Sequence, residues 1–212
     1  AVNASFDREL KIQPLDVLAR HAWADGSALD LFADVQASND AIARFAGLAE
    51  AKNFERFCAK ARSVYDTLQA PYIQSPSPSV VQIMKALGPR GLGVLASLGA
   101  MSSLWDSLGR YFKDQRMRQL FARYATYCGS SPWLAPATLM LIAQVEMDGV
   151  WSIEGGMHAL PRCLERMAKE RGVMFMYGQP CKSIDTRGGK VSGVSLGEGG
   201  YLPADAVVFN GD

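Results

Sequence analysis

The sequence lacks the short motifs by which many enzymes can be identified. Its 212 residues contain no phosphate-binding loop, no nucleophile elbow and no G-x-G-x-x-G dinucleotide fingerprint. The glycines at 155–156 and 197–200 have the spacing of turns and not of that fingerprint. Motifs alone therefore identify no reaction and no catalytic residue.

Cysteine and histidine are scarce as well. The chain has two histidines and four widely separated cysteines, with no C-x-x-C pair: Cys58, Cys128, Cys163 and Cys181. This spacing favours buried free thiols over a disulfide framework or a metal site, so no metal ligand is predicted.

Neither sign of charge is in excess. Lysine and arginine number 22 against 21 aspartates and glutamates, which gives a formal net charge of +1. A nucleic-acid-binding protein usually carries a basic excess. We therefore expect no nucleic-acid partner.

A long unbroken hydrophobic run is also missing. The most apolar stretch, residues 80–105, is interrupted by Lys85, by Gly88–Gly91 and by Gly93, whereas a transmembrane helix needs about 20 largely apolar residues in succession. No transmembrane span is predicted here. Two interpretations remain: a broken helical hairpin packed in a core, which the pattern favours, or an apolar rim that dips into a membrane surface.

The first part of the chain is rich in apolar residues at regular spacing. Residues 15–32 predict a β-hairpin around Asp25-Gly26. Helices are then expected over about 38–148, the first capped by Asp34 or Ser38 and the second ending at Pro71.

Two further helical segments complete this region. Residues 101–128 are expected to be helical and to stop at Gly129, and Pro136 is expected to open a buried helix over 137–147. The carboxylates of Glu146 and Asp148 oppose the dipole at the end of that helix. A functional partner is one interpretation, and frayed, solvated acids are the favoured one.

The predicted secondary structure changes at Gly149, from mostly helices to alternating strands, turns and one helix. Residues 149–177 predict a short strand, a Gly155-Gly156 turn, an amphipathic helix and a strand at 173–177. Strands at 181–185, 190–196 and 201–202 follow, and then an apolar strand at 206–209. We expect an α/β fold with α+β character, in which residues 1–148 are a largely helical, apolar insert and residues 149–212 carry an antiparallel meander. Both ends look cut, so we expect an internal piece of a larger protein.

Five segments carry a resemblance to a known family: Gly149–Trp151, Gly155–Leu160, Glu170–Val173, Tyr177–Ile184 and Ala204–Asp212. Together they resemble the flavin-dependent carotenoid desaturases, the bacterial phytoene desaturase family within the amine-oxidase-like flavoproteins. Residues 18–34 are most similar to the branch that desaturates hydroxy- and methoxyneurosporene. The likeness spans nearly the whole chain and is specific as a combination.

The resemblance implies FAD as cofactor. It makes residues 1–148 the substrate-binding cap and residues 149–212 part of an FAD-binding domain. It places the backbone of Cys181, after Pro180, at the adenine end. It also places Asn210, Gly211 and Asp212 at the end of a strand that points towards the cofactor. The family's glycine-rich pyrophosphate motif and its C-terminal flavin motif do not occur in this sequence, so we expect most of the FAD site to lie outside the chain and the chain alone to be inactive.

The resemblance also implies the substrate and the reaction. Two hydrogens leave adjacent carbons of an acyclic carotenoid, and hydride passes to the flavin. Because carotenoids reside in membranes, the resemblance favours membrane contact over core packing for residues 80–105. It also implies a cytoplasmic protein that is peripherally bound to the membrane. The expected substrate- or membrane-facing residues are Met84, Leu92, Val94, Leu95, Trp105, Trp133 and Trp151. No acid or base is identified, since Glu146, Asp148 and His158 lie near residue 149 but are better explained as structural.

Two other functions remain open. One is a different flavin-dependent oxidoreductase or isomerase of the same fold, acting on another polyene or an amine. The other is a non-enzymatic lipid-binding module that uses the same helical surface. A flavin spectrum of the intact protein separates the second of these from the enzymes.

Overall fold

The computed structural model describes residues 6–76, 79, 81, 85, 88, 99 and 102–211. The chain forms two compact units, Ala1–Gly156 and Met157–Asp212, which are described separately. The expected contribution of residues 80–105 to a membrane surface falls almost wholly outside the described residues, as do five predicted site residues: Met84, Leu92, Val94, Leu95 and Asp212. The functional division into 1–148 and 149–212 stays a prediction.

The first unit begins with α1 (Phe6–Glu9) and β1 (Ile12–Pro14), and then forms the predicted hairpin from β2 (Val17–Ala22) and β3 (Ala28–Phe32). The carboxylate of Asp25 closes the turn by accepting bonds from the Ser27 amide at 2.9 Å and its hydroxyl at 2.6 Å. Gly26 supplies the positive φ of 83° that this turn needs. Leu29 and Leu31 are buried, so β3 turns alternate side chains towards the core.

Two long helices follow the hairpin, α2 (Val35–Ala46) and α3 (Leu48–Leu68). Asp34 caps α2 by accepting from the Ala37 amide at 2.6 Å, whereas Ser38 is buried and exchanges hydrogen bonds with the backbone of Phe32. The chain stays helical through Pro71 as the turn η1 (Gln69–Ile73), so the prediction that Pro71 ends the helix is wrong by two residues. A π-type turn relieves the clash of a proline ring in a regular α-helix.

The segment expected to be helical over 101–128 is broken. It forms α6 (Leu104–Leu108), α7 (Gln115–Ala122) and the 3-10 helix η3 (Arg123–Cys128). Ser103 and Asp114 each accept a hydrogen bond from a backbone amide at a helix start, and these two caps define the break. Gly129 ends η3 with a φ of 61°, as predicted.

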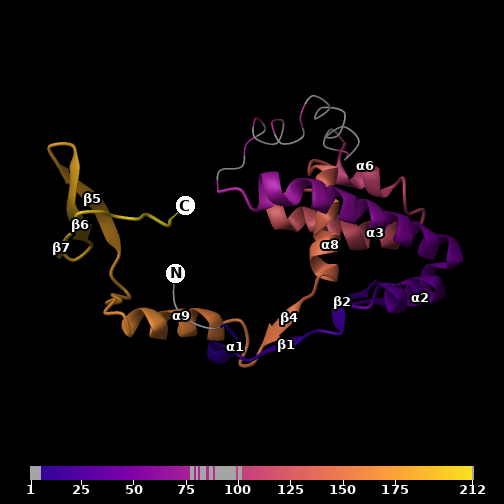
Figure 1. Cartoon of the computed structure of the whole chain (residues 1–212), viewed down its shortest axis with the longest axis horizontal. Coiled ribbons are helices and arrows are strands. Elements are labelled where there is room, and N and C mark those ends of the chain that lie inside the picture. Colours follow the sequence, from indigo (N-terminus) through magenta and orange to yellow (C-terminus); the bar gives the residue numbers. More distant parts are fainter. Residues whose placement is uncertain are drawn as a thin grey trace. The chain divides into compact units, whose positions relative to one another are not determined.

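Pro136 opens the last helical segment of the unit, as expected. It begins as η4 (Ala137–Met140) and continues as α8 (Leu141–Met147). α3 packs against α2 and α8 (Figure 1). α6 packs against α7. Aromatic rings fill the space between them, with the Phe57 and Phe121 centroids 4.5 Å apart and those of Phe112 and Phe121 5.1 Å apart.

A small sheet joins the two ends of the first unit. β1 pairs antiparallel with β4 (Trp151–Ile153), Ile12 lying opposite Ile153. The Leu15 amide extends the pairing by donating to the Val150 carbonyl at 2.8 Å. β4 was expected as a strand, but its partner was not, because three-residue segments 139 positions apart carry no mutual signal.

The second unit contains α9 (Ala159–Lys169) and the sheet β5-β6-β7, formed by Cys181–Arg187, Lys190–Leu196 and Tyr201–Pro203. All its pairs are antiparallel, which confirms the predicted meander and the mixed fold class (Figure 1). The predicted strands at 173–177 and 206–209 are wrong: neither segment is paired in the described structure. Their apolar side chains are exposed, Met174 to 87% and Val208 to 94%, so no strand among the described residues covers them.

Candidate functional site

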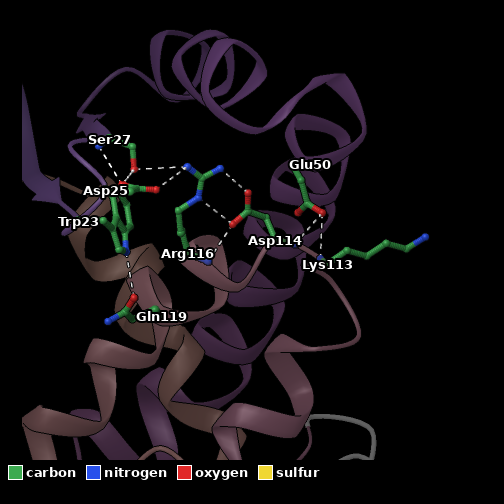
Figure 2. A network of polar contacts seen from close by, with 8 residues as sticks. All are labelled: Trp23, Asp25, Ser27, Glu50, Lys113, Asp114, Arg116 and Gln119. Carbon is green, nitrogen blue, oxygen red and sulfur yellow. Dashed lines mark hydrogen bonds and ion pairs between the residues drawn. The ribbon is translucent and has the colours of Figure 1, made fainter.

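Helix α7 of the first unit carries the polar side chains of the candidate site, and a buried carboxylate fixes where it begins. Glu50, in the first turn of α3, is 5% exposed. One of its oxygens accepts from the backbone amides of Lys113 and Asp114 at 2.9 and 3.3 Å (Figure 2). Asp114 in turn caps α7 by accepting from the Arg116 amide at 2.8 Å. The start of α7 is therefore tied to α3.

Arg116 ties α7 to the hairpin and to α2. Its guanidinium donates to the Asp114 carboxylate at 2.8 and 3.2 Å and to the Ser27 hydroxyl at 3.3 Å, and it lies 3.8 Å from the Asp25 carboxylate (Figure 2). It also stacks over the Phe45 ring, 4.2 Å from the centroid. The hydrogen bonds from Arg116 lower the pKa of the Asp114 carboxyl. Both groups are charged at neutral pH and neutralise one another.

A pocket of about 640 Å3 opens on the hairpin side of Arg116. The lining combines aromatic rings with arginines: Arg20, Ser27, Ala28, Leu29, Asp30, Phe32, Ala41, Arg44, Phe45 and Arg116. Arg20 is held by Asp30 through two bonds of 2.9 Å, and Arg116 by Asp114. Most of the positive charge around this pocket is therefore already paired.

A second pocket, of about 420 Å3, lies beside α7 and also borders Arg116. It is lined by Trp105, Gln115, Arg116, Gln119, Ala122, Pro132 and Trp133. The two tryptophan rings lie 5.1 Å apart, and the Arg118 guanidinium covers Trp105 at 4.2 Å. We call this the tryptophan pocket. Two of the residues expected to face substrate or membrane, Trp105 and Trp133, thus meet in one place.

The third predicted tryptophan lies elsewhere in the unit. Trp151 is on β4, half exposed, and its ring lies over Gly149. Gly149 has a φ of 128°, and a Cβ there would overlap the ring. Trp151 is not among the residues that line the tryptophan pocket.

One hydrogen bond sets the orientation of a pocket side chain. The Trp23 indole donates to Oε1 of Gln119 at 2.9 Å (Figure 2). An indole N–H can only donate, so it fixes the amide with its oxygen towards Trp23 and its NH2 on the other side. Sequence reasoning missed Gln119, although the spacing of Gln115, Gln119 and Ala122 places them along one helix face.

A separate ion pair lies between η3 and α8. Arg123 donates to the two oxygens of Glu146 at 2.8 and 2.6 Å, and the Tyr124 hydroxyl donates to the same carboxylate at 2.9 Å. Burial, followed by the nearby Glu146 charge, raises the pKa of Tyr124 well above its ordinary value. The expectation of a frayed, solvated Glu146 is therefore wrong, because two partners far away in the sequence hold it.

The cluster borders a narrow apolar cavity of about 20 Å3. Its lining includes Cys58, Phe121 and Tyr124, and burial raises the pKa of the Cys58 thiol to about 12. Such a volume holds no more than about one water molecule. The cavity and the ion pair are therefore structural features and not a substrate site.

The remaining candidates near residue 149 have local roles. The Asp148 carboxylate accepts from the side-chain NH2 of Gln144 at 2.7 Å, one turn away. His158 is exposed and directly precedes α9. Neither meets a second titratable group in a way that would suggest acid or base chemistry.

The predicted cofactor residues lie in the second unit. Cys181 is exposed and begins β5, an edge strand of the described sheet, so one side of that strand has no β-partner there. Asn210 and Gly211 are exposed in the unpaired terminal segment. An edge backbone can donate to and accept from an adenine ring, so this part of the chain fits the role expected of Cys181. No contact among the described residues of the unit brings Asn210 or Gly211 towards Cys181.

Other site types have little support in the described ranges. All four cysteines are free thiols; Cys58 and Cys163 are buried, whereas Cys128 and Cys181 are exposed, so the expectation of burial is wrong for the second pair. Among residues 6–76 and 102–211 no three His, Cys, Asp or Glu side chains gather as metal ligands. Within the same ranges no helix has the length and hydropathy to cross a membrane.

Comparison with known proteins gives consistent matches. Residues 38–211 match the family described as flavin containing amine oxidoreductase. The whole chain is 53% identical to the hydroxyneurosporene desaturase of Rubrivivax gelatinosus, and 98% of it aligns at 43% identity with that of Cereibacter sphaeroides. It is also 32% identical over its full length to the phytoene dehydrogenase of Streptomyces griseus. The chain spans 41% to 42% of the length of these relatives.

Proposed function

Because the chain belongs to the flavin containing amine oxidoreductase family, we propose that its protein is a desaturase of acyclic carotenoids that bear a hydroxyl or methoxyl group. Membership of the family implies a flavin cofactor. The observation that supports this substrate class is the 53% identity, over the whole chain, to a protein named hydroxyneurosporene desaturase.

The proposed reaction converts a carbon–carbon single bond of the polyene into a double bond. Two hydrogens leave adjacent carbons, one as a hydride that the flavin accepts when bound and the other as a proton. The described residues include no acid or base placed for this step. The contribution of the first unit is then to bind and orient the apolar chain and to exclude water.

The tryptophan pocket supports an apolar substrate. Trp105 and Trp133 offer flat, apolar faces, and burial of apolar surface favours binding by about 25 cal/mol per Å2. No acidic residue is among the described residues that line it. A neutral, extended hydrocarbon fits this surface better than a charged amine, which would need a carboxylate or an aromatic cage that is free of arginine.

We further propose that the flavin is FAD, with the backbone of Cys181 at the adenine end and Asn210, Gly211 and Asp212 near the cofactor. The exposed edge of β5 supports the first part. The support for the second part is the resemblance of the terminal segment to the corresponding strand of the desaturases. Release of the cofactor by acid, followed by chromatography against FAD and FMN standards, identifies it.

Contact with a membrane surface is also proposed. Three large side chains near the end of η3 and in the loop after it are mostly exposed: Tyr127 at 66%, Trp133 at 61% and Leu134 at 82%. Amphipathic aromatic rings are favoured at the boundary between lipid headgroups and acyl chains. A polyene dissolved in the bilayer would then reach the tryptophan pocket from the membrane side. From the sequence alone, we propose that residues 80–105 also contact the membrane.

The test is turnover by the intact protein. Purified flavoprotein is mixed with liposomes that contain hydroxyneurosporene, methoxyneurosporene or an amine, and products are resolved by absorbance and mass. We expect a longer chromophore and the loss of two hydrogens from the polyenes. A product that has gained oxygen, or oxidation of the amine alone, would replace the proposal with another activity of the family, and absence of flavin would reject both enzymatic functions.

A further inference from the structure

The exposed face of α7 borders the tryptophan pocket. Met117, Leu120 and Phe121 are buried at 0–1% exposure and hold the helix in the bundle. Gln115 and Gln119, four residues apart, lie on the exposed side of the helix, and both line the tryptophan pocket. Ala122 also lines the pocket but is 7% exposed and belongs to the core. The pocket therefore combines two aromatic rings with two uncharged amides.

The hydrogen bond from Trp23 uses the oxygen of the Gln119 side-chain amide and not its NH2 group. That oxygen accepts from the indole at 2.9 Å. The NH2 group, seen as the blue atom on the side away from Trp23 in Figure 2, has no hydrogen-bond partner among the described residues. What Gln119 can offer a ligand is thus a donor pair in a fixed orientation.

The charges around the pocket favour a neutral ligand. Arg116 is neutralised by Asp114, and Arg118 lies against the Trp105 ring and donates to the Trp105 carbonyl at 3.3 Å. An anion would therefore have to compete with existing partners of Arg116, and a cation would meet two guanidinium groups. A neutral oxygen that accepts a hydrogen bond from Gln119 neither competes for Arg116 nor is repelled by the guanidinium groups.

We propose that the tryptophan pocket binds the oxygen-bearing end of the polyene, with the Gln119 amide NH2 donating a hydrogen bond to its hydroxyl or methoxyl oxygen. This inference rests on the proposed function and adds to it the subsite that distinguishes oxygenated from unsubstituted substrates. Trp105 and Trp133 pack on the terminal carbons. The exposed side of Trp133 leaves the pocket open, so the rest of an extended chain can pass out of it.

Two substitutions at one position separate this role from a structural one. Gln119→Leu keeps the size of the side chain and removes the donors. Gln119→Glu keeps an acceptor for the Trp23 indole and replaces the NH2 with a second acceptor, which a hydroxyl can still donate to and a methoxyl cannot. The control is Gln36→Leu, because the side-chain NH2 of Gln36 donates only to Asp40 of its own helix among the described contacts.

The measurement is kcat/KM of the intact flavoprotein for hydroxylated, methoxylated and unsubstituted neurosporene. For Gln119→Leu we expect the preference for either oxygenated polyene over the unsubstituted one to fall about tenfold, the effect of one hydrogen bond. For Gln119→Glu we expect the ratio of methoxylated to hydroxylated turnover to fall about tenfold, and for Gln36→Leu neither ratio changes. Equal losses for all three polyenes, or unchanged ratios, would overturn the proposal.

Binding separates this inference from the proposed function. If the wild-type protein turns over none of the polyenes, the desaturase proposal fails. The pocket is then judged by quenching of tryptophan fluorescence during titration with the same three polyenes. Tighter binding of the oxygenated pair, lost in Gln119→Leu, supports the subsite, and equal dissociation constants for oxygenated and unsubstituted polyenes reject it.

Discussion

Arg123 and Glu146 form a bidentate ion pair that joins η3 to α8, with N–O distances of 2.8 and 2.6 Å and a side chain at Glu146 that is 12% exposed. The Tyr124 hydroxyl donates to the same carboxylate. Removal of one partner would leave the other charge buried and unpaired, which costs more than the pair itself contributes.

We therefore predict that Glu146→Ala lowers the free energy of unfolding of the intact protein by about 3 kcal/mol. The double variant Arg123→Met/Glu146→Leu should lose much less, since no charge is left without a partner. Asp30→Ala, which removes the bidentate partner of the exposed Arg20, is the control, and its small effect should be reduced in high salt. Equal losses in the single and double variants would contradict the account.

His21 should make stability depend on pH near neutrality. Burial, and after it the positive charge of Arg123, lower its pKa below the ordinary value of 6.5, against the smaller opposing effects of Glu146 and Asp30. The unfolded chain therefore binds the proton more tightly than the folded chain, so stability rises with pH through this range and falls as pH drops below 6.5.

We expect His21→Phe to flatten the dependence of the melting temperature on pH between about pH 8 and pH 5. Because the ring keeps its stacking with Trp23, the variant should still fold. His158→Phe, at an exposed histidine, is the matched control for the loss of an imidazole elsewhere. A wild-type protein whose melting temperature rises as the pH falls through this range would show that the sign is wrong.

Glu50 should control the start of α7. Its carboxylate accepts from two backbone amides, those of Lys113 and Asp114. Glu50→Ala leaves both without a partner and is expected to cost about 2 kcal/mol. Glu50→Gln retains an acceptor oxygen and should cost clearly less. Denaturant unfolding of the two variants measures the difference, and equal costs would show that the charge and not the acceptor is what α7 needs.

Gly149 is a position where a side chain is poorly tolerated. Its φ of 128° disfavours any L-residue, and a Cβ would overlap the Trp151 ring. Gly149→Ala should lower the melting temperature more than Gly26→Ala, where φ is 83° but the space is open. The double variant Gly149→Ala/Trp151→Ala should recover part of the loss. Equal effects at the two glycines would indicate that the backbone angle alone matters.

The periodic parts of the fold could be predicted from the sequence. The hairpin at Asp25-Gly26, the helices on either side of Gly47 and the antiparallel meander follow from local patterns, and the structure confirms them. The strands expected at 173–177 and 206–209 failed because apolarity predicts burial but does not supply a partner strand. The pairing of β1 with β4 could not be predicted for the same reason: it depends on two distant segments.

The site was predicted in part. The sequence predicts Trp105 and Trp133 to face substrate or membrane. The structure brings their rings together, and their contact with substrate or membrane stays a prediction. The polar half of the pocket was missed, because the role of Gln119 depends on Trp23, 96 residues away. The same holds for Glu146, whose partner Arg123 is 23 residues away and on another helix. Contacts of this kind are set by packing and leave no trace in spacing.

The most direct test of the central claim is single turnover without oxygen. The intact protein, with its flavin oxidised, is mixed with an equal amount of hydroxyneurosporene in liposomes, and both visible spectra are followed. We expect the oxidised-flavin absorbance to disappear at the rate at which the polyene absorbance moves to longer wavelength, with one flavin reduced for each double bond formed. A flavin that stays oxidised while the polyene is bound and unchanged would contradict the account.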